Sequence, residues 1–140
     1  MSETSRLTVV VPCSGIGKAL GSVSREAAYE LCDNLRPAST RLVALSKLVL
    51  GEEEARRLVR RSPVVTIDGC KKMCAASLVR HSDGVVSREV AVLDVFRRHS
   101  HLKPDGIAEL NEDGRELARV LATEIADDLA SLLSDGGIHA

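Results

Sequence analysis

The sequence predicts an α/β fold: a mostly parallel sheet of about four strands, flanked by helices and followed by a long C-terminal helix. Residues 7–11 and 64–67 form continuous apolar runs rich in β-branched side chains, which is typical of strands covered on both faces. Segments with apolar residues at helical spacing separate and follow these runs. Because buried strands that alternate with helices indicate helical crossovers, we expect a Rossmann-like arrangement in a single domain spanning residues 1–140.

The segment between the two apolar runs predicts a helix and a further strand. In SREAAYELCDNL (residues 24–35), apolar residues recur at helical spacing: Ala27, Ala28, Leu31 and Leu35. Ser22 or Ser24 is available as the N-cap of this helix, and Pro37 lies just beyond its end. The stretch TRLVALSKLVL (residues 40–50) is a strand candidate, although its C-terminal part could instead lead into the next helix.

The later elements follow from charge and periodicity. GEEEARRLVRRSP (residues 51–63) carries glutamates at its start and arginines toward its end, which complements the dipole of a helix. Three further segments are assigned: a helix at KKMCAASLVRH (residues 71–81), a fourth strand at REVAVLDVF (residues 88–96) and an irregular linker at RRHSHLKPDG (residues 97–106). Residues 111–133 predict one long amphipathic helix before Gly136 and Gly137, since apolar residues step at three or four positions: Leu117, Leu121, Ile125, Leu129 and Leu132.

Composition excludes several classes of function. The formal net charge is −1, and Tyr29 and Phe96 are the only aromatic residues, so nothing favours binding to nucleic acid. The N-terminus lacks the pattern of a signal peptide, and no apolar run approaches the ~20 residues that a membrane-spanning helix needs. We therefore expect a cytoplasmic protein that contacts no membrane. In that reducing compartment, a cysteine cluster favours metal binding or thiol chemistry over a structural disulfide.

Three of the four cysteines follow predicted buried strands. Cys13 comes just after the run at residues 7–11, and Cys70 and Cys74 come just after the run at residues 64–67. Neighbouring parallel strands whose helices go to opposite faces leave a crevice at their carboxyl ends. If the first and third strands are neighbours, their loops bring Cys13 close to Cys70 and Cys74.

The spacing of Cys70 and Cys74 suits a shared metal ion. On a helix, residues four positions apart have Cβ atoms about 5 to 6 Å apart, whereas a disulfide needs roughly 3.5 to 4.5 Å. Asp68 and Gly69 suit the entry to that turn, because the Asp68 side chain can cap free N–H groups and Gly69 permits backbone geometry that a Cβ atom would block. The alternative is that the cysteines are packed as small apolar side chains, and Cys32 inside the first predicted helix favours such a core role.

Other candidate motifs are incomplete. Gly15, Gly17 and Gly21 give GxGxxxG, one residue longer than the dinucleotide-binding pattern, so we expect them to let the chain turn tightly around Cys13. Lys18 does not complete a phosphate-binding loop, because Ala19 stands where serine or threonine is needed. His99 and His101 fit a solvated loop better than a metal site. His81 lies two turns of helix beyond Cys74, which favours a surface position, although it is also a candidate fourth ligand.

Three stretches together resemble the zinc-binding family named for its Asp-Gly-Cys motif, the DGC domain proteins. They are VVPCSGIGKALGSVSREAAYEL, GEEEARRLVRRSPVVTIDGCKKMCAASLV and VLDVFRRHSHLKPDGIAEL, which span nearly the whole chain. The resemblance implies a zinc ion bound by Cys13, Cys70 and Cys74. The family pattern usually has a further cysteine on the second strand, where this chain has Ala44, so the fourth position is left to Cys32, His81, water or an external ligand.

Three functions are compatible with these features. The first is a zinc-binding protein that handles metal or acts as an accessory, with an open fourth position that favours a functional over a structural ion. The second is a thiol-dependent redox or nucleophilic enzyme that uses Cys70 with Cys13 or Cys74. The third is a scaffold that binds a partner through its long C-terminal helix. Because the chain is long enough to form its own core, we expect it to stay folded when the metal is removed.

Overall fold

The computed structural model describes residues 7–13, 18–69, 72–106 and 109–139, with side chains of the last helix described as far as Ala130. The chain forms four strands in these ranges: β1 (Thr8–Pro12), β2 (Thr40–Leu42), β3 (Val64–Asp68) and β4 (Val86–Ala91). All of them run parallel, in the spatial order β2-β1-β3-β4. The predicted α/β fold with a four-stranded parallel sheet is confirmed.

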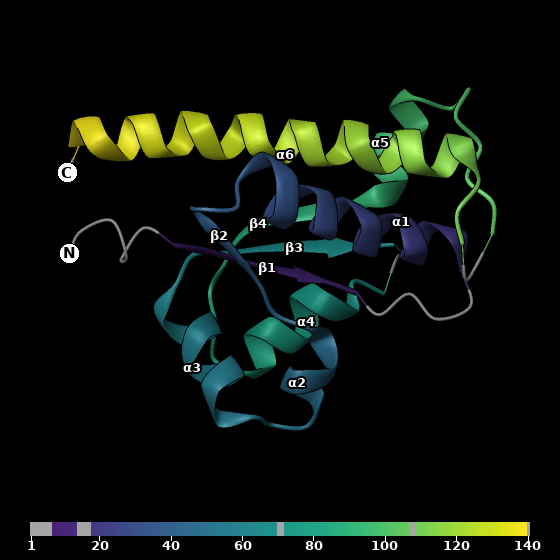
Figure 1. The fold of residues 1–140 in the computed structure, drawn as a ribbon. Coiled ribbons are helices and arrows are strands. Elements are labelled where there is room, and N and C mark those ends of the chain that lie inside the picture. Colours follow the sequence, from purple (N-terminus) through teal and green to yellow (C-terminus); the bar gives the residue numbers. More distant parts are fainter. Residues whose placement is uncertain (1–6, 14–17, 70–71, 107–108, 140) are drawn as a thin grey trace.

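Helices cover both faces of this sheet (Figure 1). One face carries α1 (Ala19–Tyr29), the π-helical turn η2 (Glu30–Leu35), α5 (Val92–Arg98) and α6 (Glu112–His139). The opposite face carries α2 (Leu45–Val49), α3 (Glu53–Arg61) and α4 (Cys74–His81). The sheet is therefore the middle layer of three, as its continuous apolar strands predict.

Each face of the sheet has its own hydrophobic core. Val10, Val65 and Ile67 point toward α1 and α6, where fully buried leucine and isoleucine side chains pack on them: Leu31, Leu117, Leu121 and Ile125. Val9, Val11 and Val64 point the other way, into a smaller core under α2, α3 and α4. Alternate residues of one strand thus serve two cores, which explains the absence of polar alternation along β1 and β3.

Several predicted boundaries are wrong. The first helix begins at Ala19, with Lys18 as its N-cap, so Ser22 and Ser24 lie inside the helix and neither is its N-cap. The stretch at residues 40–50 holds only a three-residue strand and then α2, as its alternative interpretation allowed. The helix predicted over residues 71–81 begins only at Cys74, because Met73 has a left-handed backbone with φ of 52°.

The C-terminal part of the chain differs in two places. The fourth strand ends at Ala91, and the residues that follow form α5, where Val92 and Val95 at i and i+3 are both buried. The long helix is confirmed, but it passes through Gly136 and Gly137 rather than ending before them. Within the described ranges, none of the helices combines the length and hydropathy required to cross a membrane.

Candidate functional site

The first and third strands are neighbours, as predicted. β1 and β3 pair in parallel from Val9↔Val64 to Pro12↔Ile67. β1 leads to α1 on one face of the sheet, whereas β3 leads to α4 on the other (Figure 1). The strand order therefore reverses between β1 and β3, and the carboxyl ends of these two strands form the rim where ligands bind in open α/β sheets.

Cys13 is fixed at this rim by contacts with β3 and α1. It follows β1 directly, its amide donates to the Ile67 carbonyl at 2.8 Å, and only 7% of its surface is exposed. Its sulfur accepts a hydrogen bond from the amide of Gly69 at 3.3 Å and lies 3.2 Å from the hydroxyl oxygen of Ser24. The sulfur of Cys13 is thus in direct contact with the turn that carries the Asp-Gly-Cys sequence.

Gly69 is required by the close approach of that turn to α1. A Cβ atom at this position would lie 2.7 Å from both the Gly21 amide nitrogen and the Leu20 carbonyl oxygen, which is closer than real Cβ atoms come. The expectation that Gly69 permits geometry forbidden to other residues is confirmed. Gly21 lies inside α1 and does not turn the chain around Cys13, so that expectation is wrong; Gly15 and Gly17 lie outside the described residues.

Asp68 caps α4 from the end of β3. Its carboxylate is 1% exposed and accepts hydrogen bonds from the amides of Ala75 at 2.7 Å and Ala76 at 3.2 Å. Burial raises the pKa of Asp68 above its ordinary value, and these two hydrogen bonds only partly offset the effect. Both oxygens are therefore engaged by the first turn of α4, and the capping role predicted for Asp68 is confirmed.

Cys74 is the first residue of α4, and its side chain is exposed. The helix predicted from residue 71 therefore does not extend before Cys74, where Met73 has a left-handed backbone. Cys70 itself lies outside the described residues. Cys13 and Cys74 nevertheless follow β1 and β3 at the same edge of the sheet, as the topology requires.

The comparison with known families agrees with this arrangement. The family model described as the DGC domain matches residues 9–128, which include most of β1, all of β3 and most of α6. The chain belongs to the DGC domain family. No curated protein and no solved structure matches it.

Ala44 occupies the same rim of this DGC domain. It is the N-cap of α2 and comes two residues after β2, whose neighbour is β1. The amide of Val43 donates to the carbonyl of Val10 at 3.0 Å, which carries the pairing with β1 one residue past β2. The position where the resemblance implies a further cysteine therefore lies near the carboxyl ends of the strands, and the residue there is alanine.

Cys32 cannot replace that missing thiol. It lies in η2 and packs against the core under α6, beside the side chain of Thr40; burial raises the pKa of its thiol. Thr40 pairs with Thr8 at the start of β1, five residues before Cys13. At about 3.3 Å per residue, these five residues span roughly 16 Å along the strand. Cys32 therefore lies near the amino-terminal ends of the strands, whereas Cys13 lies at their carboxyl-terminal ends.

His81, His99 and His101 of the DGC domain do not join Cys13 and Cys74 at the rim. His81 is the exposed last residue of α4, about 10 Å along the helix from Cys74. The Nε2 atom of His99 lies 3.7 Å from Glu124 on α6, and its ring centroid is 6.2 Å from that of His101. Among the described residues, which do not include Cys70, no three or more His, Cys, Asp and Glu side chains form a group that could hold a metal ion.

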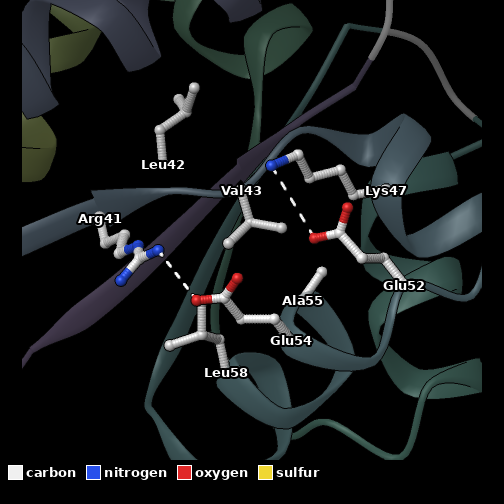
Figure 2. Close-up of a pocket in the computed structure, with 8 residues that line it drawn as sticks. All are labelled: Arg41, Leu42, Val43, Lys47, Glu52, Glu54, Ala55 and Leu58. Carbon is white, nitrogen blue, oxygen red and sulfur yellow. Dashed lines mark ion pairs between the residues drawn. The ribbon is translucent and has the colours of Figure 1, made fainter.

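A charged pocket beside β2 is a separate feature (Figure 2). Arg41 points to Glu54 at 3.5 Å and Lys47 to Glu52 at 3.8 Å, over a floor that includes Val43. These ion pairs are exposed and pair the basic groups with acidic ones from α3 and its N-terminus. The residues lining this pocket include no cysteine or histidine, so it offers no ligand for a soft metal ion.

Sequence reasoning missed one residue of the site. Ser24 is fully buried beside the Cys13 sulfur, but the sequence suggested it only as a helix cap. A serine eleven positions after a cysteine carries no recognisable motif. The sequence indicates only that Ser24 lies near the start of the helix that follows the strand ending at Cys13.

Proposed function

We propose that this DGC domain binds a zinc ion through the thiolates of Cys13, Cys70 and Cys74, at the carboxyl ends of β1 and β3. The observation that carries the proposal is the 3.3 Å contact between the Gly69 amide and the Cys13 sulfur. Gly69 directly precedes Cys70, and this contact places it next to Cys13, which is 56 positions away in the sequence. Cys74 begins the helix that follows the same turn.

The donor set suits zinc, since thiolates bind this ion at about 2.3 Å and favour it over hard cations such as Mg²⁺. Ala44 presents a methyl group near this edge and Cys32 lies at the opposite one, so this chain supplies three thiolates and leaves one position exchangeable. A bound zinc ion with an exchangeable position would supply a Lewis acid or a transferable metal. We therefore favour metal handling or an accessory role over a closed structural site.

Metal analysis of the purified protein tests the proposal. Protein prepared without chelator is expected to carry zinc near one equivalent, and Cys13→Ser and Cys70→Ser are each expected to lose most of it. Cys32→Ser is the matched control, because Cys32 lies at the other edge of the sheet, and it should retain the wild-type zinc content. Wild-type protein without zinc, or equal zinc in the Cys13 and control variants, would contradict the proposal.

The alternative function is a thiol-dependent enzyme that uses Cys70 with Cys13 or Cys74. The exposed thiol of Cys74 at the start of α4 favours it, because thiol–disulfide exchange requires an accessible sulfur. Free-thiol counts before and after treatment with a small-molecule disulfide would separate the two functions. Metal-free protein that gains a reversible disulfide supports the enzyme, whereas zinc-loaded protein with thiols protected until chelation supports metal binding.

A further inference from the structure

Ser24 is a buried polar group in direct contact with the Cys13 sulfur. Its side chain is completely buried on α1, and its hydroxyl oxygen lies 3.2 Å from the sulfur. The same hydroxyl donates to the carbonyl of Gly21 at 2.6 Å. On the other side of the sulfur, the Gly69 amide donates at 3.3 Å. The sulfur is thus held between a donor on the β3 turn and a hydroxyl on α1.

The protons of this cluster can be assigned from these contacts. A hydroxyl has a single proton, and in the observed arrangement Ser24 gives it to the Gly21 carbonyl. The contact between Ser24 and Cys13 is therefore made by the thiol proton, which Cys13 donates to the serine oxygen. A cysteine that binds a metal ion has lost that proton. The unchanged arrangement would then leave the hydroxyl lone pairs facing a negatively charged sulfur.

We propose that Ser24 is a positioning residue for the Cys13 thiolate, and that its hydroxyl proton turns from the Gly21 carbonyl to the sulfur when Cys13 binds the metal. The inference rests on the proposed zinc site. The turn needs only rotation about the Cβ–Oγ bond, so no heavy atom has to move. The Gly21 carbonyl lies in the first turn of α1, where it also faces the amide four residues on, as in any α-helix.

This change gives the metal-bound sulfur two donors from two different elements. Gly69 is fixed on the β3 turn by its backbone contact with α1, and Ser24 is fixed inside α1 itself. Two donors on rigid elements orient the sulfur and disperse its negative charge. Groups that support metal ligands in this way typically contribute about 10- to 100-fold to metal affinity.

Ser24→Ala tests the role of the hydroxyl. The zinc affinity of the full-length protein would be measured by competition with a chromophoric chelator, and the sulfur-to-metal charge-transfer bands of the Co²⁺-substituted protein would be recorded. We expect Ser24→Ala to bind zinc about tenfold more weakly and to shift those bands. Circular dichroism and the Tm of the metal-free variant establish that it is folded, and if it is not, Ser24→Thr, which keeps the hydroxyl, is expected to retain wild-type affinity.

Thr40→Ala is the matched control. Thr40 is also buried and its hydroxyl donates to the carbonyl of Arg36 at 2.6 Å, but it pairs with Thr8 at the start of β1, five residues before Cys13. It should leave the zinc affinity and the Co²⁺ spectrum unchanged. Wild-type affinity in Ser24→Ala, or an equal loss in Thr40→Ala, would overturn the role of Ser24 while leaving the zinc site intact. Absence of zinc binding in the wild-type protein would overturn both.

Discussion

At the residue scale, Gly69 determines how closely the β3 turn approaches α1. Its backbone lies against that of Leu20 and Gly21, where no side chain can be accommodated. The same approach brings the Gly69 amide to the Cys13 sulfur. The glycine of the Asp-Gly-Cys sequence therefore has a packing role that is separate from any chemistry of the cysteine after it.

Gly69→Ala is expected to destabilise the fold and weaken the site together. The added methyl group would meet backbone atoms at 2.7 Å, which cannot move as the end of a flexible side chain can. Overpacking of this kind typically lowers the free energy of unfolding by about 1 to 3 kcal/mol. Urea denaturation measures this effect, with Ser77→Ala on the exposed side of α4 as a neutral control. A Gly69→Ala protein as stable as the wild type would show that the turn does not need this close approach.

The residues of the site differ in how far sequence could predict them. Cys13 and Asp68 follow continuous apolar strands, and parallel topology alone places such residues at one rim. Ser24 could not be predicted, because its role depends on how α1 crosses β1 and not on any local pattern. The spacing of Cys70 and Cys74 predicts a helix from residue 71, but Met73 has a left-handed backbone and α4 begins only at Cys74. Spacing alone does not reveal such a turn.

At the element scale, the sequence predicts strands and helices best where a segment fits the pattern of a strand or of a helix, but not both. β1 and β3 are uninterrupted apolar runs, and α3 has charges arranged for a helix dipole. Residues 88–96 fit both periodicities, since Val90 and Val92 alternate while Val92 and Val95 are spaced as on a helix. The packing of α5 on the α6 side of the sheet decides between them. Such tertiary contacts are not encoded in a window of nine residues.

The link between α5 and α6 depends on pH. Arg98 donates to both carboxylate oxygens of Glu124 at 3.0 Å, and together with His99 it lowers the pKa of Glu124 below its ordinary value. A lowered pKa in the folded state contributes stability that is present above the unfolded pKa, near 4.5, and lost as the pH falls through the folded value.

Arg98→Gln is therefore expected to be slightly less stable than the wild type at pH 7. The difference between the two proteins should shrink as the pH falls below about 4.5, because protonated Glu124 no longer distinguishes arginine from glutamine. Chemical denaturation of both proteins from pH 3 to pH 7 measures it. Arg97→Gln serves as the control, since Arg97 pairs only with Asp94 on its own helix in the described contacts. A pH-independent difference for Arg98→Gln would contradict the assignment.

At the scale of the whole molecule, the fold does not rely on the cysteine site for its cohesion. Two cores lie on opposite faces of the sheet, and the larger one is built from aliphatic residues of α1, α5 and α6. Cys13 is at the edge of the smaller core, and Cys74 is exposed. Structural zinc sites contribute ~10 to 16 kcal/mol in small domains that are unfolded without the ion. A chain with two cores of its own has no such requirement.

Removal of the proposed zinc ion is therefore expected to leave the protein folded. A ligand that binds only the native state stabilises it by RT ln(1 + [L]/Kd), so chelation should lower the Tm by several degrees without abolishing a cooperative transition. Calorimetry and far-ultraviolet circular dichroism of the chelated protein measure this, and restoring one equivalent of zinc should restore the Tm. Cys13→Ser, which would lose the metal without a chelator, should unfold like the chelated wild type. If chelated protein shows no cooperative transition, the ion is structural, and the exchangeable position proposed for it would have to be abandoned.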